Sequence, residues 1–482
     1  MKRQYISVDV LPAWAKLNDV AFRGVQVKQQ LVHQGMDKGS AVVAERELQT
    51  RDDSLLMIIP KEMILSLDAV VEYGKSDKHL REVLEAMGTF GRTARGAILI
   101  FLLMQITNAC PDIPERIGIS RPWTEYIKFL PSKIPLPTLW GDMEQDMLTG
   151  TSLAIALHEK LNSLMSEYEM LKQGTVNIPW CKKYWWDEDT GLLLFDDWKL
   201  VDAMYRSRAL DLPRTGHAMV PCIDMANHAS GDETIALYET DDTGDGILLL
   251  RDGKTLHKDD EVTITYGDDK GACEMVFSYG FIESAMQTAK EMFLDLDIPD
   301  DDPLKRAKNA IAGAPPGFRV FDSGESVDWE GPFVWLICVN EEDGLQFGIL
   351  QSTDGERELE ATWKGDKLSD SFQLRDMIRQ DSRWDIFKLR VIVTLQGRVE
   401  SQMASINASE EVIQTVQQQA GIDHVACDMA LKLRQLEWDL LSKAYLKFEV
   451  QKNELLESET VRDYLACSNT EESTRLLEED FS

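Results

Sequence analysis

Hydrophobic and polar residues alternate in two different ways along the first 175 residues. Between residues 15 and 75, short apolar runs bounded by Gly, Asp and Pro predict a small, irregular β-sheet. From about residue 78 to residue 175, apolar residues recur at spacings of three and four, which is typical of amphipathic helices. Four prolines between residues 120 and 141 interrupt this helical pattern, so we expect loops there.

Short strand-like runs return after about residue 212 and continue to residue 281. Residues 246–267 predict a strand, an Asp-Gly turn and a second strand. A stretch rich in Asp and Pro follows near residue 300, and beyond it the spacing of apolar residues predicts helices to the end of the chain.

These patterns predict an α+β protein in which a helical insert splits a β-rich unit and an all-α domain follows. We expect the two parts of the β-rich unit at residues 1–95 and 196–285, with the insert at 96–195. The C-terminal helical domain would span 286–467, and an acidic tail would occupy 468–482.

The composition narrows the classes of partner. The chain has 482 residues, which favours about three domains, and its net charge of −32 would repel nucleic acids and anionic membranes. This charge suits a basic protein partner, although plain solubility explains it equally well. The longest apolar run, 97–104, is too short to span a membrane, and residues 1–14 lack a signal-peptide pattern. We therefore expect a cytoplasmic or nuclear protein.

The seven cysteines are scattered and form no Cys-x-x-Cys pair. This distribution indicates neither a zinc site nor a disulfide framework, and it fits a reducing compartment.

Three segments far apart in the sequence carry candidate chemistry. In the first, residues 38–47 (KGSAVVAERE), the small residues Gly39 and Ala41 would let the backbone approach a ligand closely. A simple turn between strands explains this segment as well.

The second segment, residues 220–230 (VPCIDMANHAS), places Asp224, Asn227 and His228 within an apolar run. On one helical turn these spacings would put all three side chains on one face. Buried polar groups are costly unless they find partners, so either the fold or a ligand must satisfy them. Asn227 and His228 could be a metal pair, but further ligands at convincing spacing are missing, and a lone His is usually a core residue.

The third segment, residues 261–283, contains two Tyr-Gly pairs, Tyr266-Gly267 and Tyr279-Gly280, on either side of a short helix-like stretch. Buried tyrosines supply an aromatic wall and a hydroxyl that needs a hydrogen-bond partner. Taken alone, they could be ordinary core residues.

In combination, the three segments resemble those of the SET-domain methyltransferases, and within them the class of the Rubisco large-subunit lysine methyltransferase. VPCIDMANHA is similar to the family's Val-Pro, Asp, Asn-His pattern, and ITYG followed by SYGF matches in content and separation. Residues 122–153 resemble the family's insert, and residues 431–446 resemble its C-terminal helix. The resemblance covers nearly the whole chain.

This resemblance implies a split SET domain with a pseudoknot-like crossing, a helical substrate-binding domain, and S-adenosylmethionine (AdoMet) as the cofactor. In the family, the Asn-His segment lines the cofactor site beneath the chain that bears the later tyrosine. By resemblance, the cofactor-binding residues are Gly39, Ala41, Arg208, Asn227, His228 and Tyr266; the substrate-binding residues are Tyr238 and Asp224; and the catalytic residues are Tyr279 and Tyr266. A cysteine-rich segment after the SET domain is missing, so a metal is not expected.

The function implied is methylation of a lysine in a non-histone protein, for example a ribosomal protein or a translation factor. Two alternatives remain open. One branch of the class modifies histidine, and the chain could also be an inactive SET-fold scaffold. The scaffold alternative is motivated by Ala41 and Ala272, which stand where the family usually has Gly and often has Asn.

Overall fold

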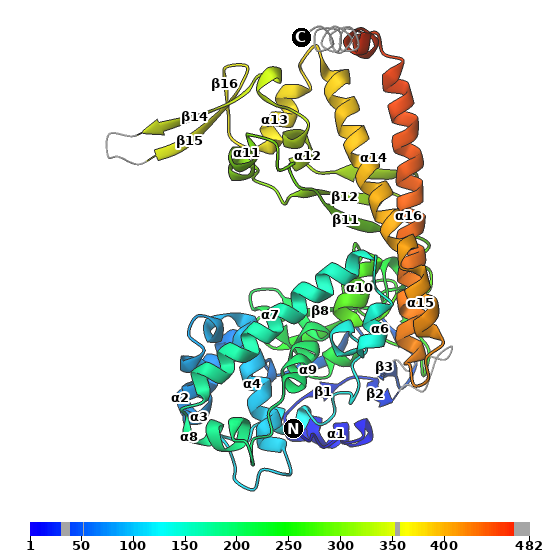
Figure 1. Cartoon of the computed structure of the whole chain (residues 1–482). Helices are drawn as coiled ribbons and strands as arrows, with labels where there is room; N and C mark the ends of the chain where they lie inside the picture. The colour runs from blue at the N-terminus through cyan, green and yellow to red at the C-terminus, as the bar shows by residue number, and fades with distance from the viewer. Residues whose placement is uncertain (30–38, 52, 352–356, 467–482) are drawn as a thin grey trace. The chain divides into compact units, whose positions relative to one another are not determined.

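The computed structural model describes residues 1–29, 39–51, 53–351 and 357–466 (Figure 1). The predicted acidic tail, 468–482, lies outside these residues. The chain forms two compact units. The first comprises Met1–Gly141, Ala156–Lys270 and Glu274–Phe281, and the second comprises Asp142–Ile155, Gly271–Cys273 and the chain from Ile282 onward.

The first unit is built on a four-stranded antiparallel sheet with the order β1-β5-β9-β8. Its strands come from both sides of the helical insert: β1 (Ala21–Phe22), β5 (Leu55–Ile59), β8 (Ala236–Thr240) and β9 (Gly246–Leu250). Three two-stranded sheets accompany it: β2 (Val25–Gln29) with β3 (Ser40–Ala44), β4 (Leu48–Gln49) with β10 (Thr255–Leu256), and β6 (Ala209–Leu212) with β7 (Gly216–Met219). The predicted α+β class, with a β-rich unit interrupted by helices, is confirmed.

The strand, Asp-Gly turn and second strand expected within residues 246–267 are present as β9, the turn at 252–253 and β10, but the two strands do not pair with each other. Strand β9 pairs with β5 on one side and β8 on the other, so neither of its edges is available. Strand β10 therefore continues past the turn at Gly253 and pairs with β4 instead.

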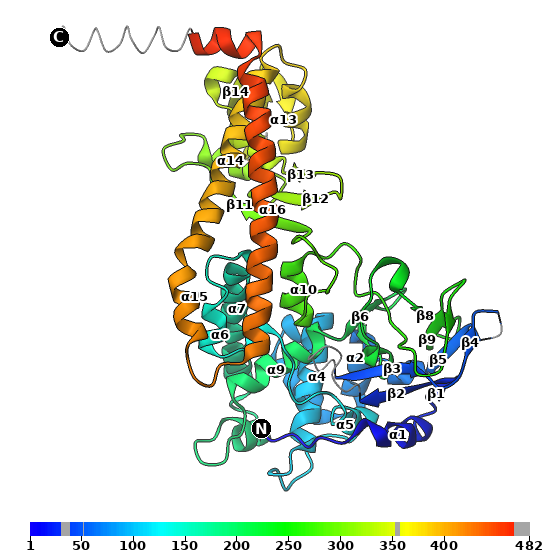
Figure 2. The same ribbon diagram turned by 90° about the vertical axis from the view of Figure 1, so that its right-hand side faces the viewer.

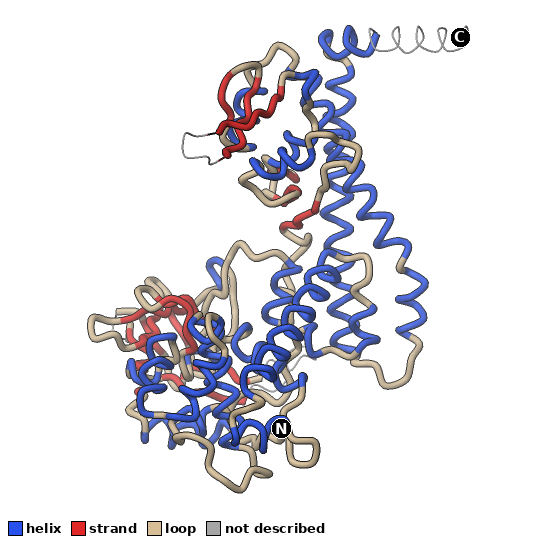
Figure 3. Tube along the Cα trace, turned by 60° about the vertical axis from the view of Figure 1, so that its left-hand side comes forward, coloured by secondary structure: helices blue, strands red, loops and turns tan. Residues whose placement is uncertain are grey.

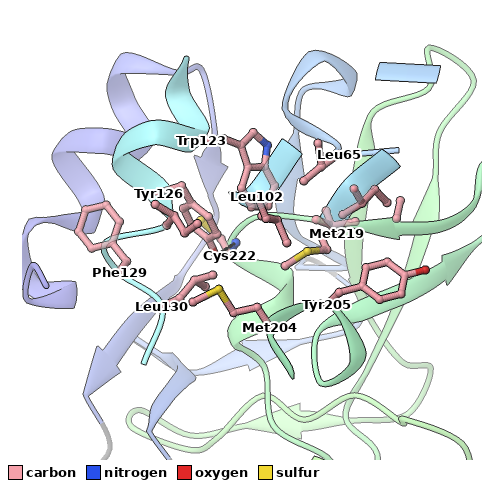
Figure 4. Packing of buried hydrophobic residues seen from close by; sticks show 14 of the residues in the cluster. Leu65, Leu102, Trp123, Tyr126, Phe129, Leu130, Met204, Tyr205, Met219 and Cys222 are labelled. Carbon is pink, nitrogen blue, oxygen red and sulfur yellow. Dashed lines mark hydrogen bonds between the residues drawn. The ribbon is translucent and has the colours of Figure 1, made fainter. Parts of the chain in front are cut away.

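Helices between and around these strands supply a large part of the core of the first unit. They are α1 (Leu11–Leu17), α2 (Leu67–Ser76), α3 (Lys78–Ala86), α4 (Ala94–Ala109), α5 (Pro122–Tyr126), α8 (Pro179–Cys181) and α9 (Phe195–Arg206). Helix α4 is apolar on every side and buried along most of its length, as expected for a helix at the centre of a core. Trp123 and Tyr126 from α5 pack against Cys222 and Met219 (Figure 4). The insert and the later strands thus share one core.

The second unit contains two long helices, α14 (Trp384–Ala408) and α16 (His424–Leu456), which pack side by side (Figures 1 and 2). Shorter helices also belong to it: α6 (Asp142–Asp146), α11 (Lys305–Ile311), α12 (Phe333–Ile337), α13 (Ser371–Ile378) and α15 (Glu410–Gln417). Two helices, α7 (Ser152–Thr175) and α10 (Ala272–Tyr279), begin in the second unit and end in the first.

The prediction that the C-terminal domain is all-α is wrong in part, because two three-stranded sheets precede the long helices (Figure 3). The first contains β11 (Glu291–Asp295), β12 (Gly317–Asp322) and β13 (Val327–Glu330), and the second contains β14 (Leu345–Gln351), β15 (Arg357–Trp363) and β16 (Asp366–Leu368). Burial in β11 alternates with period two: Met292 and Leu294 are buried, whereas Phe293 is exposed. Such short alternations were hidden between longer helical patterns.

Within the described ranges, no helix combines the length and hydropathy needed to cross a membrane.

A buried carboxylate holds the start of α7 inside the second unit. Glu437, on α16, accepts hydrogen bonds from the backbone N–H of Ser152, at 3.0 Å, and from the Ser152 hydroxyl. One turn earlier on the same helix, Arg434 donates to the carbonyl oxygens of Thr149 and Ile406. Burial raises the pKa of Glu437 from 4.5 to about 7, although the two Ser152 bonds act in the opposite direction.

We expect Glu437→Gln to stabilise the protein above neutral pH. A carboxyl whose pKa is raised on folding contributes stability below its unfolded pKa, near 4.5, and this contribution is lost as the pH rises through about 7. The amide stays neutral, its oxygen can accept the Ser152 N–H and its NH2 group can donate to the Ser152 hydroxyl. Its advantage should therefore grow between pH 5 and pH 8, to at most about 3 kcal/mol. Denaturant unfolding at both pH values measures it. Glu454→Gln, at an exposed position of α16, is the control, and an equal response of the two variants would contradict the prediction.

Candidate active site

The site forms where two sequence-distant segments lie side by side in the first unit. After a single 3-10 turn at Ile223–Met225, the chain runs parallel to the segment that leads to Tyr266. The N–H of Ile264 donates to the carbonyl of Asn227 at 2.9 Å, and the N–H of Ala229 donates to the carbonyl of Ile264 at 3.0 Å. This pairing places the Asn-His segment against the chain that bears the tyrosines, as the predicted crossing requires.

Strand β3 flanks the other side of the same chain. The N–H of Val262 donates to the carbonyl of Val42 at 2.8 Å, so the segment 260–264 lies between β3 and the Asn-His segment. Gly39 precedes β3 with a φ of +74°, a conformation that favours glycine, and Ala41 is fully buried within the strand. The structure therefore brings all three predicted segments together.

The fold supplies partners for the polar residues of the second segment. Asn227 donates to the Glu261 carboxylate at 2.6 Å, and Nδ1 of His228 accepts the N–H of Tyr266 at 3.0 Å. Only Asp224 lies in the 3-10 turn, so the interpretation of the three residues as one helical face is wrong. Their spacing reflects a turn followed by an extended chain that needs side-chain bonds to hold it.

A cavity of about 170 Å³ opens beside this crossing. Its lining residues are Ser207, Arg208, Ala209, Leu210, Asp211, His217, Asp224, Tyr238, Ile264, Tyr266, Lys270 and Tyr279. Five predicted site residues thus line one cavity. Gly39, Ala41, Asn227 and His228 lie outside its lining and contribute to the layers that support it, so their contact with a ligand stays a prediction.

Aromatic rings stack along one wall of the cavity. The His228 ring stacks on Tyr266, with centroids 5.2 Å apart, and Tyr266 stacks on Tyr279 at 4.6 Å. The Tyr266 hydroxyl donates to the carbonyl of Ala226 at 2.8 Å, and the Tyr279 hydroxyl donates to the carbonyl of Tyr266 at 3.3 Å. The second bond is long, so the Tyr279 hydroxyl is weakly held and remains suited to a ligand.

Burial keeps these phenols protonated. It raises the pKa of Tyr279 to about 12, raises the pKa of Tyr266 further, and also raises that of Tyr238. At neutral pH the tyrosines are therefore hydrogen-bonding groups with electron-rich ring faces and do not act as bases. Such a wall suits an amine or a methylated ammonium group.

A buried charge pair forms another part of the lining. Nη1 of Arg208 donates to the backbone carbonyl of Asp224 at 2.8 Å and lies 3.8 Å from the Asp224 carboxylate. Burial raises the pKa of Asp224, and the Arg208 cation opposes this shift. Nε of Arg208 and Oδ2 of Asp224 are buried and have no hydrogen-bond partner in the described part of the chain. Both residues line the cavity, so these atoms are candidates for bonding a ligand.

Of the lining residues that the sequence did not single out, three have a charged or imidazole side chain: Asp211, His217 and Lys270. The Lys270 ammonium lies 5.7 Å from the centre of the Tyr279 ring and is paired with Glu274. Asp211 and His217 face each other across the β6–β7 hairpin. The spacing Tyr-Gly-x-x-Lys and the turn in LDLPRTGHAM were the available signals, but charged residues near turns are too common to single out.

Arg206 fixes the end of the helix that carries Tyr279. From α9 it donates to the carbonyl of Phe277, at 2.8 Å, and to the Thr138 hydroxyl, at 2.9 Å. Its guanidinium also lies over the Phe277 ring, and its Nε is 3.4 Å from Oδ2 of Asp202. The last turn of α10 is therefore tied to α9 and, through Arg206 and Thr138, to the insert.

The chain has the fold of a known SET-domain structure. A crystal structure of the SET domain of LSMT bound to MeLysine and AdoHcy superposes with a TM-score of 0.65 at 18% sequence identity, covering 95% of this chain and 96% of that chain. Comparison with descriptions of known protein families gave no match.

Several curated proteins are similar to this chain in sequence. SET domain-containing protein 8 of Schizosaccharomyces pombe is 26% identical over 352 residues, which is 72% of this chain and 76% of the relative. The Rubisco large-subunit N-methyltransferase of Pisum sativum is 24% identical, covering 62% of this chain and 56% of the relative. The actin-histidine N-methyltransferase of Danio rerio is 23% identical, covering 51% and 38%. The chain is thus similar in sequence to SET-domain methyltransferases, including the Rubisco large-subunit enzyme.

We expect Arg206→Met to loosen the last turn of α10. The change leaves the Phe277 carbonyl without its cationic donor, so amide hydrogen exchange at residues 274–280 should speed up at least tenfold. Arg121→Met is a matched control, because Arg121 likewise lies over a ring, that of Tyr73, and donates to the Tyr73 carbonyl. Unchanged exchange in Arg206→Met, or an equal effect of the control on residues 274–280, would contradict this role.

Proposed function

We propose that this protein is an AdoMet-dependent protein-lysine N-methyltransferase that acts on a non-histone protein. The observation that carries the proposal is the cavity in the SET domain, which is lined by Tyr238, Tyr266 and Tyr279 together with the Arg208–Asp224 pair. A related fold binds MeLysine and AdoHcy in its crystal structure. These two ligands, a methylated lysine and the product form of AdoMet, indicate the chemistry that the cavity residues of this chain would support.

The residues at the cavity fit AdoMet. The cofactor carries a carboxylate, and the buried Nε of Arg208 is a donor that needs an acceptor. The Asn-His segment and β3 would form the adjoining backbone surface. When bound, AdoMet supplies an electrophilic methyl group on a sulfonium.

The tyrosines would prepare the acceptor amine. A free lysine has a pKa of about 10.4 and is protonated at neutral pH, but burial between aromatic walls lowers that pKa and favours the neutral amine. The protonated hydroxyl of Tyr279 would align the amine, and this positioning can supply much of the rate enhancement. A general base is not required, because the amine loses its proton to solvent before the transfer.

Histidine is the second candidate acceptor, favoured by the similarity to the actin-histidine N-methyltransferase. The decisive experiment incubates the full chain and labelled AdoMet with extract from cells that lack its gene, and then identifies the methylated residues by mass spectrometry. Methyl-lysine in a basic cytoplasmic or nuclear protein is the expected result. Methyl-histidine would support the second candidate, and AdoMet binding without any transfer would support a scaffold.

We expect the double substitution Asn227→Ala/His228→Ala to weaken AdoMet binding at least tenfold, about 1.4 kcal/mol. The two side chains hold Glu261 and the backbone of Tyr266, so their loss should loosen the crossing beside the cofactor. Calorimetric titration with AdoMet measures the effect, and His257→Ala, at an exposed position, is the control. Unchanged affinity in a folded double variant would remove these residues from the cofactor site.

We expect Tyr279→Phe to lower the single-turnover methyl-transfer rate about a hundredfold or more while AdoMet affinity stays within twofold. The ring still packs on Tyr266, whereas the hydroxyl that would align the amine is lost. Tyr168→Phe is the matched control, because its hydroxyl bonds the carbonyl of Leu193 away from the cavity. If both variants transferred methyl at the wild-type rate, Tyr279 would be a structural residue.

A further inference from the structure

Tyr126 lies outside the cavity but is bonded to its lining. It ends α5 in the insert, is fully buried, and packs among the rings of Trp14, Trp123 and Phe129 (Figure 4). Its hydroxyl accepts the backbone N–H of Cys222 at 2.8 Å and donates to Oδ1 of Asp224. A phenol has one hydrogen and two lone pairs, so both bonds form together.

The first of these bonds is made to Cys222, whose backbone conformation is unfavourable. Cys222 has a φ of +70° and ψ of −38°, a region that L-residues other than glycine rarely adopt. Such a conformation persists only when its surroundings enforce it. The turn at Cys222 directs the following residues into the crossing, so the Tyr126 hydroxyl stabilises the point where the Asn-His segment begins.

The second bond reaches the charge pair of the cavity. Asp224 receives the Tyr126 hydroxyl on its carboxylate and the Arg208 guanidinium on its backbone carbonyl. Two residues further along, the carbonyl of Ala226 accepts the hydroxyl of Tyr266. The Tyr126 hydroxyl therefore bonds Asp224 directly and reaches Arg208 and Tyr266 through the backbone carbonyls of Asp224 and Ala226. Arg208, Asp224 and Tyr266 all line the cavity.

The protonation of Asp224 depends on the groups that face it: Arg208, Tyr126, Cys222 and Tyr266. Burial raises the pKa of Asp224, whereas the Arg208 cation and the Tyr126 hydrogen bond favour the carboxylate. Loss of the Tyr126 hydroxyl would let Asp224 take up a proton at higher pH. A neutral Asp224 would hold Arg208 less firmly.

We propose that Tyr126 is a positioning residue that orients the Arg208–Asp224 pair for the cofactor and the acceptor. The inference rests on the proposed function. It makes the insert part of the catalytic apparatus, because a side chain between residues 120 and 141 determines the geometry of a cavity whose lining begins at Ser207.

The test compares Tyr126→Phe with Tyr168→Phe, which removes a tyrosine hydroxyl bond remote from the cavity. AdoMet affinity is measured by calorimetry, and single-turnover transfer to the acceptor in the cell extract is measured between pH 5 and pH 9. For Tyr126→Phe we expect at least tenfold weaker binding and a shift of the acidic limb of the rate profile to higher pH by at least half a pH unit. For Tyr168→Phe we expect neither change.

A rescue variant separates positioning from a general loss of stability. Glycine adopts a positive φ readily, so Cys222→Gly in the Tyr126→Phe background should recover at least threefold in AdoMet affinity. If Tyr126→Phe alone does not melt cooperatively, the double variant takes its place as the test protein. The double variant should then fold and should still show the shifted pH profile.

The outcomes distinguish the two proposals. Wild-type binding of AdoMet, combined with identical affinity and pH profile in Tyr126→Phe and Tyr168→Phe, would overturn the role of Tyr126 alone. Absence of recovery in a folded double variant would overturn the contribution of the Cys222 turn. Failure of the wild type itself to bind AdoMet would overturn the proposed function and this inference with it.

Discussion

The parallel pairing of residues 226–229 with residues 262–264 is the constraint on which the site depends. It uses only a few backbone hydrogen bonds, between Ile264 and its neighbours Asn227 and Ala229. Because parallel strands need a long crossover connection, the pairing cannot form from neighbouring sequence alone. Side chains therefore reinforce it: Asn227 bonds Glu261, and His228 bonds the backbone of Tyr266. This reinforcement of the pairing explains why Asn227 and His228 occur in an otherwise apolar segment.

Buried polar contacts of α9 also support the site from within the apolar core. Asp202 on α9 is paired with Arg95, Lys160 and Arg206, and these cations lower its pKa although burial raises it. Buried charges are costly unless they are paired, so such a cluster permits few alternative arrangements. Through Arg206 it reaches the carbonyl of Phe277, two residues before Tyr279. The aromatic wall is thus held by contacts from α9 as well as by its own stacking.

The class of fold could be predicted from the sequence, and five of the residues singled out there line one cavity. This was possible because the motifs at 220–230 and 261–283 combine unusual residues at fixed spacings. Prediction failed where the outcome depends on pairing partners. The strands on either side of the Asp252-Gly253 turn were predicted, but not that β10 pairs with β4 because β9 already has two neighbours. Tyr126 looked like one more aromatic residue of a loop-rich stretch, since only the folded chain shows that its hydroxyl meets Cys222 and Asp224. The strands β11–β16 were missed because their short alternations lie between stronger helical periodicities.

The central position of β9 has a consequence for how the chain is made. Leu55 of β5 pairs with Leu249 of β9, roughly 190 residues further along. At typical synthesis rates of about 5–20 residues per second, β5 would wait roughly 10 to 40 seconds on the ribosome before its partner is available. During that interval β5, with the apolar sequence Leu55–Ile59, has an unpaired edge that can join other chains. The early apolar helix α4 would face the same delay, so the nascent chain exposes apolar surface until the second part of the split unit has been synthesised.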